Sequence, residues 1–151
     1  MKKSLHCLLK SSFFNLCQTA FLLVLASCST IAMYDKEAYK NATELKVDAR
    51  NLMELASQPY SAHEKEAKDF QSKLDKAYEY DNGRIKNTIT VKQWDILRDP
   101  KRDLLGGFLA EWKEEGALRP RYIQNKQVQI GRAFDTIIQL ESGKLKPADV
   151  Q

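Results

Sequence analysis

The sequence predicts an all-α protein: a helical bundle of three long and two short helices that occupies residues 34–146. Two observations predict this class. Over most of this range apolar side chains recur at steps of three and four residues, the spacing of one helix face, and the stretches between the periodic segments are rich in Pro, Gly and helix-capping residues. With 151 residues, 43% of them hydrophobic and 9% aromatic, the chain can bury one core.

The first two long helices are expected on either side of Pro59, which cannot continue a helical hydrogen-bond ladder. Ser61 and Glu64 have the spacing of a capping box, so the second helix should begin there. The short connection makes the two helices antiparallel neighbours. The expected apolar stripe of the first is Tyr34, Ala38, Ala42, Leu45, Ala49, Leu52 and Ala56, and that of the second is His63, Ala67, Phe70, Leu74 and Ala77.

Residues 81–91 allow two interpretations. Asn82-Gly83 is a tight-turn signal and the residues after it alternate weakly in polarity, which leaves a small hairpin open. A loop is favoured, because two isolated strands would be only marginally stable. Thr90 and Gln93 then form a second capping box, which should start a short helix carrying Val91, Trp94 and Leu97.

The other two helices are expected at residues 100–115 and from Pro120 to about Leu140. Asp99-Pro100 is typical of an N-cap followed by proline at the first helical position, and Gly116 supplies a left-handed stop. The apolar face of the first comprises Leu104, Leu105, Phe108, Leu109 and Trp112; that of the second comprises Tyr122 or Ile123, Ile130, Phe134, Ile137, Ile138 and Leu140. Gly143 ends the final helix, and residues 147–151 form a tail.

The N-terminus has the three-part layout of a bacterial export signal: basic Lys2 and Lys3, a mostly apolar stretch over residues 13–26, and small residues after it. An uncleaved membrane anchor is the alternative. It would need about 20 apolar residues, whereas polar residues interrupt this stretch before Ala20.

Leu25-Ala26-Ser27-Cys28 resembles the lipobox of bacterial lipoproteins. The resemblance implies that Cys28 receives a diacylglyceryl group on its sulfur and that signal peptidase II cuts just before it. Residues 1–27 would then be a lipoprotein signal peptide and residues 28–33 a lipidated tether. Ser29 stands where lipoproteins retained in the inner membrane often carry Asp, so the resemblance implies a lipid anchor in the outer membrane, with the protein on the periplasmic or the surface face.

Cysteine usage and charge narrow the possible chemistry. Removing residues 1–27 takes away Cys7 and Cys17, and lipid consumes Cys28, so disulfide, zinc and cysteine-nucleophile chemistry are not expected in the bundle. The remaining 124 residues carry 21 basic and 20 acidic side chains, a balance that argues against nucleic acid as a partner.

Few residues of the bundle are candidates for a site. His63 lacks a second His at metal-ligand spacing, so a place at the rim of the core is favoured. Gly106 and Gly107 lie inside a helical stretch; they are interpreted as a frayed helix or a break into two pieces, or else as a hinge or a close approach by another helix, such as one of a partner. In the second case replacing both with Ala should weaken partner binding without lowering stability. Trp94 and Trp112 would add to a partner surface if they are exposed.

The function expected from these features is that of a lipid-anchored, non-enzymatic interaction or support module of the cell envelope, needing no cofactor and binding an envelope protein. One alternative is an exclusion or immunity lipoprotein of the kind carried by phages and plasmids. Another is an envelope enzyme using carboxylates in a cleft, although no known catalytic or cofactor motif is present.

Overall fold

The computed structural model describes residues 34–146 and 149–150, and these residues contain five α-helices and no strand. The long helices are α2 (Lys36–Glu54), α3 (Glu64–Asn82) and α6 (Pro120–Glu141), and the short ones are α4 (Thr88–Arg98) and α5 (Leu105–Glu115). The predicted all-α fold of three long and two short helices is confirmed. A loop, not a hairpin, joins α3 to α4. The predicted signal peptide, lipidated tether and Cys28 lie outside the described residues, as does most of the tail.

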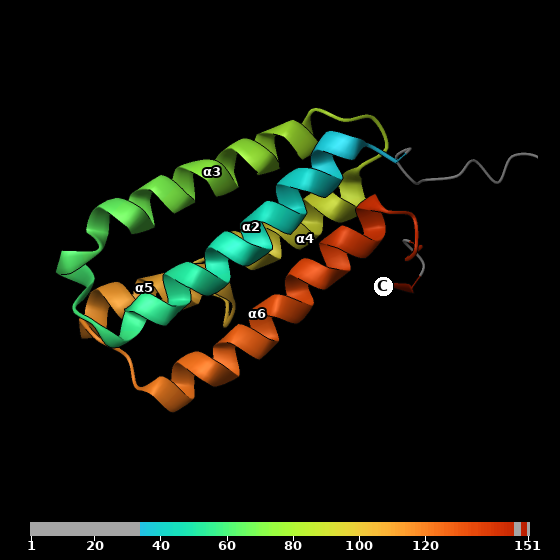
Figure 1. Ribbon diagram of the computed structural model, residues 1–151. Helices are drawn as coiled ribbons and strands as arrows, with labels where there is room; N and C mark the ends of the chain where they lie inside the picture. Colours follow the sequence, from blue (N-terminus) through green and yellow to red (C-terminus); the bar gives the residue numbers. More distant parts are fainter. Residues whose placement is uncertain (1–33, 147–148, 151) are drawn as a thin grey trace, which may run out of the picture. The chain divides into compact units, whose positions relative to one another are not determined.

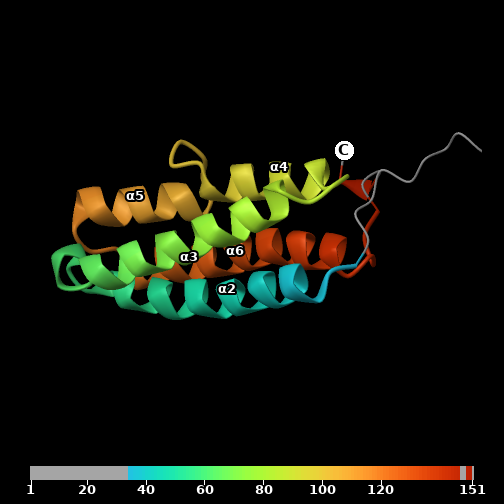
Figure 2. The ribbon, with the colours of Figure 1, turned by 90° about the horizontal axis from the view of Figure 1, so that it is seen from above.

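The helices of residues 34–146 pack as four antiparallel rods. Helix α2 packs against α3 and α6, and α4 packs against the same two helices from the other side. Three of the rods are the single helices α2, α3 and α6. The fourth rod consists of two helices, α4 and α5, which follow each other end to end, as Figure 2 shows. With its short connections this is the up-down-up-down arrangement of a four-helix bundle. Consequently α2 begins at the end of the bundle where α6 finishes (Figure 1).

Helix α2 begins where local chemistry favours a helix start. The carboxylate of Asp35 accepts hydrogen bonds from the backbone N–H groups of Glu37 and Ala38, at 2.8 and 3.0 Å. The predicted apolar stripe is buried from Ala38 onward, whereas Tyr34 is exposed. Two 3₁₀ turns, η1 (Leu55–Ser57) and η2 (Tyr60–Ala62), then reverse the chain around Pro59.

Both predicted capping boxes are wrong. Ser61 lies within η2, and the N-cap of α3 is His63, which makes no side-chain cap. The amide of Tyr60 instead donates to the carbonyl of Gly116 at 2.6 Å, so a tertiary contact directs the chain here rather than local capping. Helix α4 begins at Thr88, two residues before the predicted cap, and Thr90 is buried inside it.

The predicted helix start at Pro100 is also wrong, since α5 begins only at Leu105. The Asp99 carboxylate accepts from the amide of Lys101 at 2.9 Å, and the Asp99 carbonyl accepts from the amide of Arg102 at 3.0 Å, so these residues form turns. Buried Lys126 of α6 reaches this turn and binds the carbonyl and the carboxylate of Asp103. The turn is therefore fixed to α6 where the fourth rod breaks.

Candidate functional site

The structure corrects the predicted partner surface. Trp94 and Trp112 are both 0% exposed, so neither can contact a partner. The ring of Trp94 packs edge-on against Phe134, with centroids 6.0 Å apart, and the Trp112 indole N–H donates to the carbonyl of Gln58 at 3.0 Å. Both tryptophans serve as core residues.

Gly106 and Gly107 do lie at a close approach, but the approaching backbone is the chain's own. A Cβ on Gly106 would stand 2.1 Å from the carbonyl oxygen of Arg98, and one on Gly107 would stand 2.0 Å from that of Arg102. Gly106 therefore lets α5 start against the end of α4, and Gly107 lets it start against the turn that joins the two helices. Another helix does approach Gly106, but it is α4 of the same chain and not a partner, so this pair is a requirement of the fold.

His63 lies at the rim of the core, as expected. Its Nε2 is 3.0 Å from Oε1 of Gln58, and its ring lies 6.1 Å from that of Trp112. Among the described residues no group of three or more His, Cys, Asp or Glu side chains is placed to hold a metal ion.

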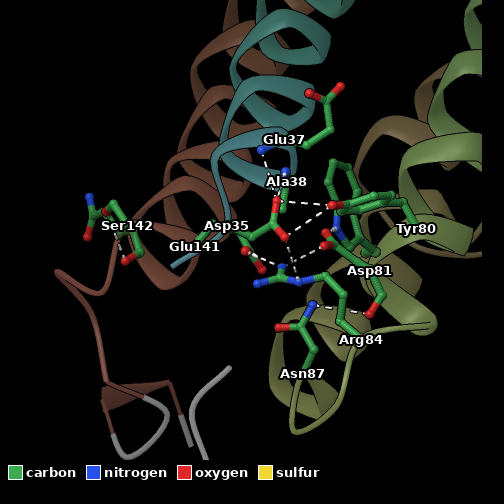
Figure 3. Close-up of polar contacts among 11 residues, drawn as sticks. Asp35, Glu37, Ala38, Tyr80, Asp81, Arg84, Asn87, Glu141 and Ser142 are labelled. Carbon is green, nitrogen blue, oxygen red and sulfur yellow. Dashed lines mark hydrogen bonds and ion pairs between the residues drawn. The ribbon is translucent and has the colours of Figure 1, made fainter. Parts of the chain in front are cut away.

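A cluster of polar side chains, partly buried, lies at the end of the bundle where α2 begins and α6 finishes (Figure 3). At its centre is Arg84, which follows α3 and whose side chain is only 14% exposed. Its guanidinium binds the carboxylate of Asp81 at 2.9 Å and that of Glu141, and Nε lies 3.8 Å from Asp35. We call these four residues, with Tyr80, the Arg84 cluster.

The cluster joins elements that are distant in the sequence. Asp35 caps α2, Asp81 lies in the last turn of α3, and Glu141 is the last residue of α6. The hydroxyl of Tyr80 donates to the Asp35 carboxylate at 3.1 Å. From inside the core the indole N–H of Trp94, on α4, donates to Asp81 Oδ2 at 2.6 Å. Four helices are thereby tied at one end.

Burial and neighbouring charge shift the pKa values of the cluster in opposite directions. Burial, together with the nearby Asp81 charge, raises the pKa of Glu141, against the lowering effect of Arg84 and Thr90. The amide of Ala38 and the Tyr80 hydroxyl hold the pKa of Asp35 below its usual value, and Asp35 in turn raises the pKa of the Tyr80 phenol. Although burial opposes it, the carboxylates of Glu141 and Asp81 raise the pKa of Arg84.

The contacts of the two buried carboxylates, Asp81 and Glu141, are directed into the protein. Both carboxylate oxygens of Asp81 are engaged, one by Arg84 and the other by Trp94, and Oε2 of Glu141 contacts Arg84. A general acid or base must present an oxygen to a reacting group, and in Asp81 neither oxygen is available for this. The arrangement is suited to holding helix ends together.

Sequence reasoning missed this cluster, although a signal was present. Asp81 continues the core-facing stripe of α3, four residues after Ala77, and Glu141 continues that of α6, four residues after Ile137. A charged side chain on a core-facing stripe predicts a buried partner of opposite charge. The turn signal of Asn82-Gly83 placed Asp81 in the predicted loop, whereas the structure has it in the last turn of α3.

Glu141 should give the protein a pH dependence that can be measured by substitution. Because its pKa is raised in the folded protein, its contribution to stability is fully present below its ordinary pKa of 4.5 and is lost as the pH rises through the folded value. We expect E141Q, which stays neutral, to gain stability relative to the unsubstituted protein as the pH rises from about 4 to 7. Urea unfolding of both proteins at each pH measures this. A difference that falls over the same range would contradict this expectation.

A second feature is a groove between α2 and α6, with a volume of about 360 Å³. Most of its lining is apolar. We call it the α2–α6 groove; it is lined by Thr43, Lys46, Val47, Ala49, Arg50 and Met53 of α2 and by Gln127, Ile130, Gly131, Phe134 and Ile138 of α6. Lys46 forms an ion pair with Asp135 at its edge.

Gly131 lies in the interior of α6, and nothing in the chain requires a glycine there. A Cβ at this position would meet only Cε of Lys46, at 4.0 Å, which is an ordinary contact. Glycine within a helix is less stable than alanine by about 0.5–1 kcal/mol. We therefore expect G131A to raise the free energy of unfolding by about 0.5–1 kcal/mol, measured by chemical denaturation. A loss of stability would show that the helices need this space.

Comparison with known proteins finds no matching family model, no matching curated protein and no matching solved structure. Among the described residues, none of the helices combines the length and the hydropathy needed to span a bilayer.

Proposed function

We propose that the protein is a lipid-anchored module of the bacterial cell envelope, held in the outer membrane by acyl chains on Cys28, and that it acts by binding rather than by catalysis. The observation that carries the anchor is the Leu25-Ala26-Ser27-Cys28 motif, which follows an apolar stretch and a basic N-terminus. Two or more acyl chains attach a protein stably, where one chain is marginal.

The start of the bundle is compatible with such an anchor. Seven residues, counted from Ser29 to Asp35, lead from Cys28 to the N-cap of α2. Even fully extended, they reach about 25 Å at most. An acylated Cys28 would thus keep the end of the bundle that carries the Arg84 cluster close to the membrane surface, and it would leave the sides of the helices accessible to a partner.

The inward contacts of the Arg84 cluster support the non-catalytic part of the proposal. The buried carboxylates of Asp81 and Glu141 share one cation, Arg84, and Asp81 also accepts a hydrogen bond from Trp94 in the core. Such contacts are typical of structural groups. The α2–α6 groove is, by contrast, apolar and open to a ligand, as binding sites usually are.

Cysteine substitutions test the anchor directly. Cells expressing the full chain are fed an alkyne-bearing palmitate, and the purified protein is examined by in-gel fluorescence and by mass spectrometry of its N-terminus. We expect the label and a mature N-terminus at Cys28, both lost in C28A. C7A and C17A are matched controls, since both lie in the segment predicted to be removed, and both should keep the label. An intact Met1 with an unmodified Cys28 thiol would overturn the proposal.

A further inference from the structure

The α2–α6 groove is long and narrow. Its lining extends from Thr43 to Met53 on one helix and from Gln127 to Ile138 on the other, which at the helical rise corresponds to about 15 Å. A volume of about 360 Å³ spread over that length leaves the width of one extended hydrocarbon chain.

Gly131 gives the groove its depth. It lies beside Phe134 and Ile130 on α6 and leaves open the space that any larger side chain would fill. Since α2 does not approach closely enough to require a glycine, the packing of the bundle does not offset its cost to the helix. A ligand that lies over Gly131 accounts for the residue.

The charges along the groove differ from one end to the other. Lys46 is neutralised by Asp135. Arg50 is exposed, and none of the carboxylates in the part of the chain that the structure describes pairs with its guanidinium. The side-chain amide of Gln127 donates to the carbonyl of Arg50 at 3.3 Å, which places a second polar group at the same end. Toward Ile138 the lining is Thr43, Val47 and Phe134 with the neutral Lys46–Asp135 pair, so the unpaired charge lies at the Arg50 end.

We infer that the α2–α6 groove binds a single-chain fatty acid anion, with its hydrocarbon chain lying over Gly131 and Phe134 and its carboxylate beside Arg50. Guanidinium groups bind carboxylates through paired hydrogen bonds, and an apolar site with one charged group at its end fixes the orientation of such a ligand. The inference goes beyond the proposed function and does not rest on Cys28.

The test measures binding of radiolabelled laurate to the full chain held in nanodiscs of phosphatidylcholine, by equilibrium dialysis against empty nanodiscs. We expect a saturable component of one laurate per chain. G131L, which fills the groove with a helix-favouring side chain, should weaken it at least about tenfold. R50E, an exposed change that leaves the fold intact, should do the same, whereas R132E on the exposed face of α6 should leave affinity unchanged.

Four results would overturn the inference. The first is no laurate bound beyond that in empty nanodiscs. The second is equal affinity in G131L. The third is equal binding of methyl laurate, which lacks the charge and should bind at least about tenfold more weakly. The fourth is a protein that binds no laurate but sediments as a dimer, where G131L dissociates the dimer. This result would assign the groove to a second copy of the chain.

Discussion

Replacing Arg84 with Met should cost the protein about 3–5 kcal/mol of unfolding free energy, because the substitution leaves buried carboxylates without their cation. Asp81 and Glu141 are 1% and 3% exposed, and Arg84 is the cation that contacts both. Methionine keeps much of the volume of the side chain, so the loss reports charge rather than a cavity. Urea unfolding followed by circular dichroism measures it.

Two comparisons make the result of R84M specific. K73M removes an exposed ion pair with Asp48, 2.8 Å long, and should change stability by about 1 kcal/mol or less. Adding D81N and E141Q to R84M should restore part of the loss, because the amides need no cation. A loss below about 1 kcal/mol in R84M, or no recovery in the triple variant, would show that the carboxylates are not held by Arg84.

Gly106→Ala should also destabilise the bundle, by at least about 2 kcal/mol, because the added methyl group meets backbone that has little room to move. The new Cβ would lie 2.1 Å from the carbonyl oxygen of Arg98 and 2.6 Å from the carbonyl carbon of Asp99. This is the opposite of the effect on stability expected from sequence for a pair at a partner surface, where alanine would not lower stability. Thermal and chemical unfolding of G106A measure the loss.

G131A is the matched control for G106A. The substitution is the same and both glycines are helical, but the space around the added Cβ differs: 4.0 Å to the end of a lysine at Gly131, against 2.1 Å to a backbone oxygen at Gly106. The two variants should therefore change stability in opposite directions. A gain of stability in G106A would contradict the packing of α4 against the start of α5.

The sequence predicted the helices better than their ends. Periodicity identified every α-helix of the described residues, though neither of the 3₁₀ turns, because burying an apolar stripe is the strongest local signal. Helix starts were missed at Ser61, Thr90 and Pro100, since tertiary contacts such as that from Tyr60 to Gly116 decide where the chain turns. Gly116 and Gly143, in contrast, stop their helices with positive φ as expected, for reasons local to each glycine.

The candidate sites were harder to predict than the fold, because a site depends on which faces meet. Trp94 resembles a hot-spot residue in sequence, yet its indole serves a buried carboxylate. Arg50 and Gly131 are 81 positions apart, and only the antiparallel pairing of α2 with α6 brings them to one groove. Nothing in the local pattern of either residue indicates the other.

The position of Asp35 has a mechanical consequence. If the chain is pulled from its N-terminal side, tension enters the bundle at this residue, which is bonded to Tyr80 at the end of α3 and lies within 3.8 Å of Arg84. Through Arg84 the same load reaches the last residue of α6. Helix α2 therefore resists separation from the bundle on its own, because a force applied through the segment before Asp35 is distributed over α2, α3 and α6.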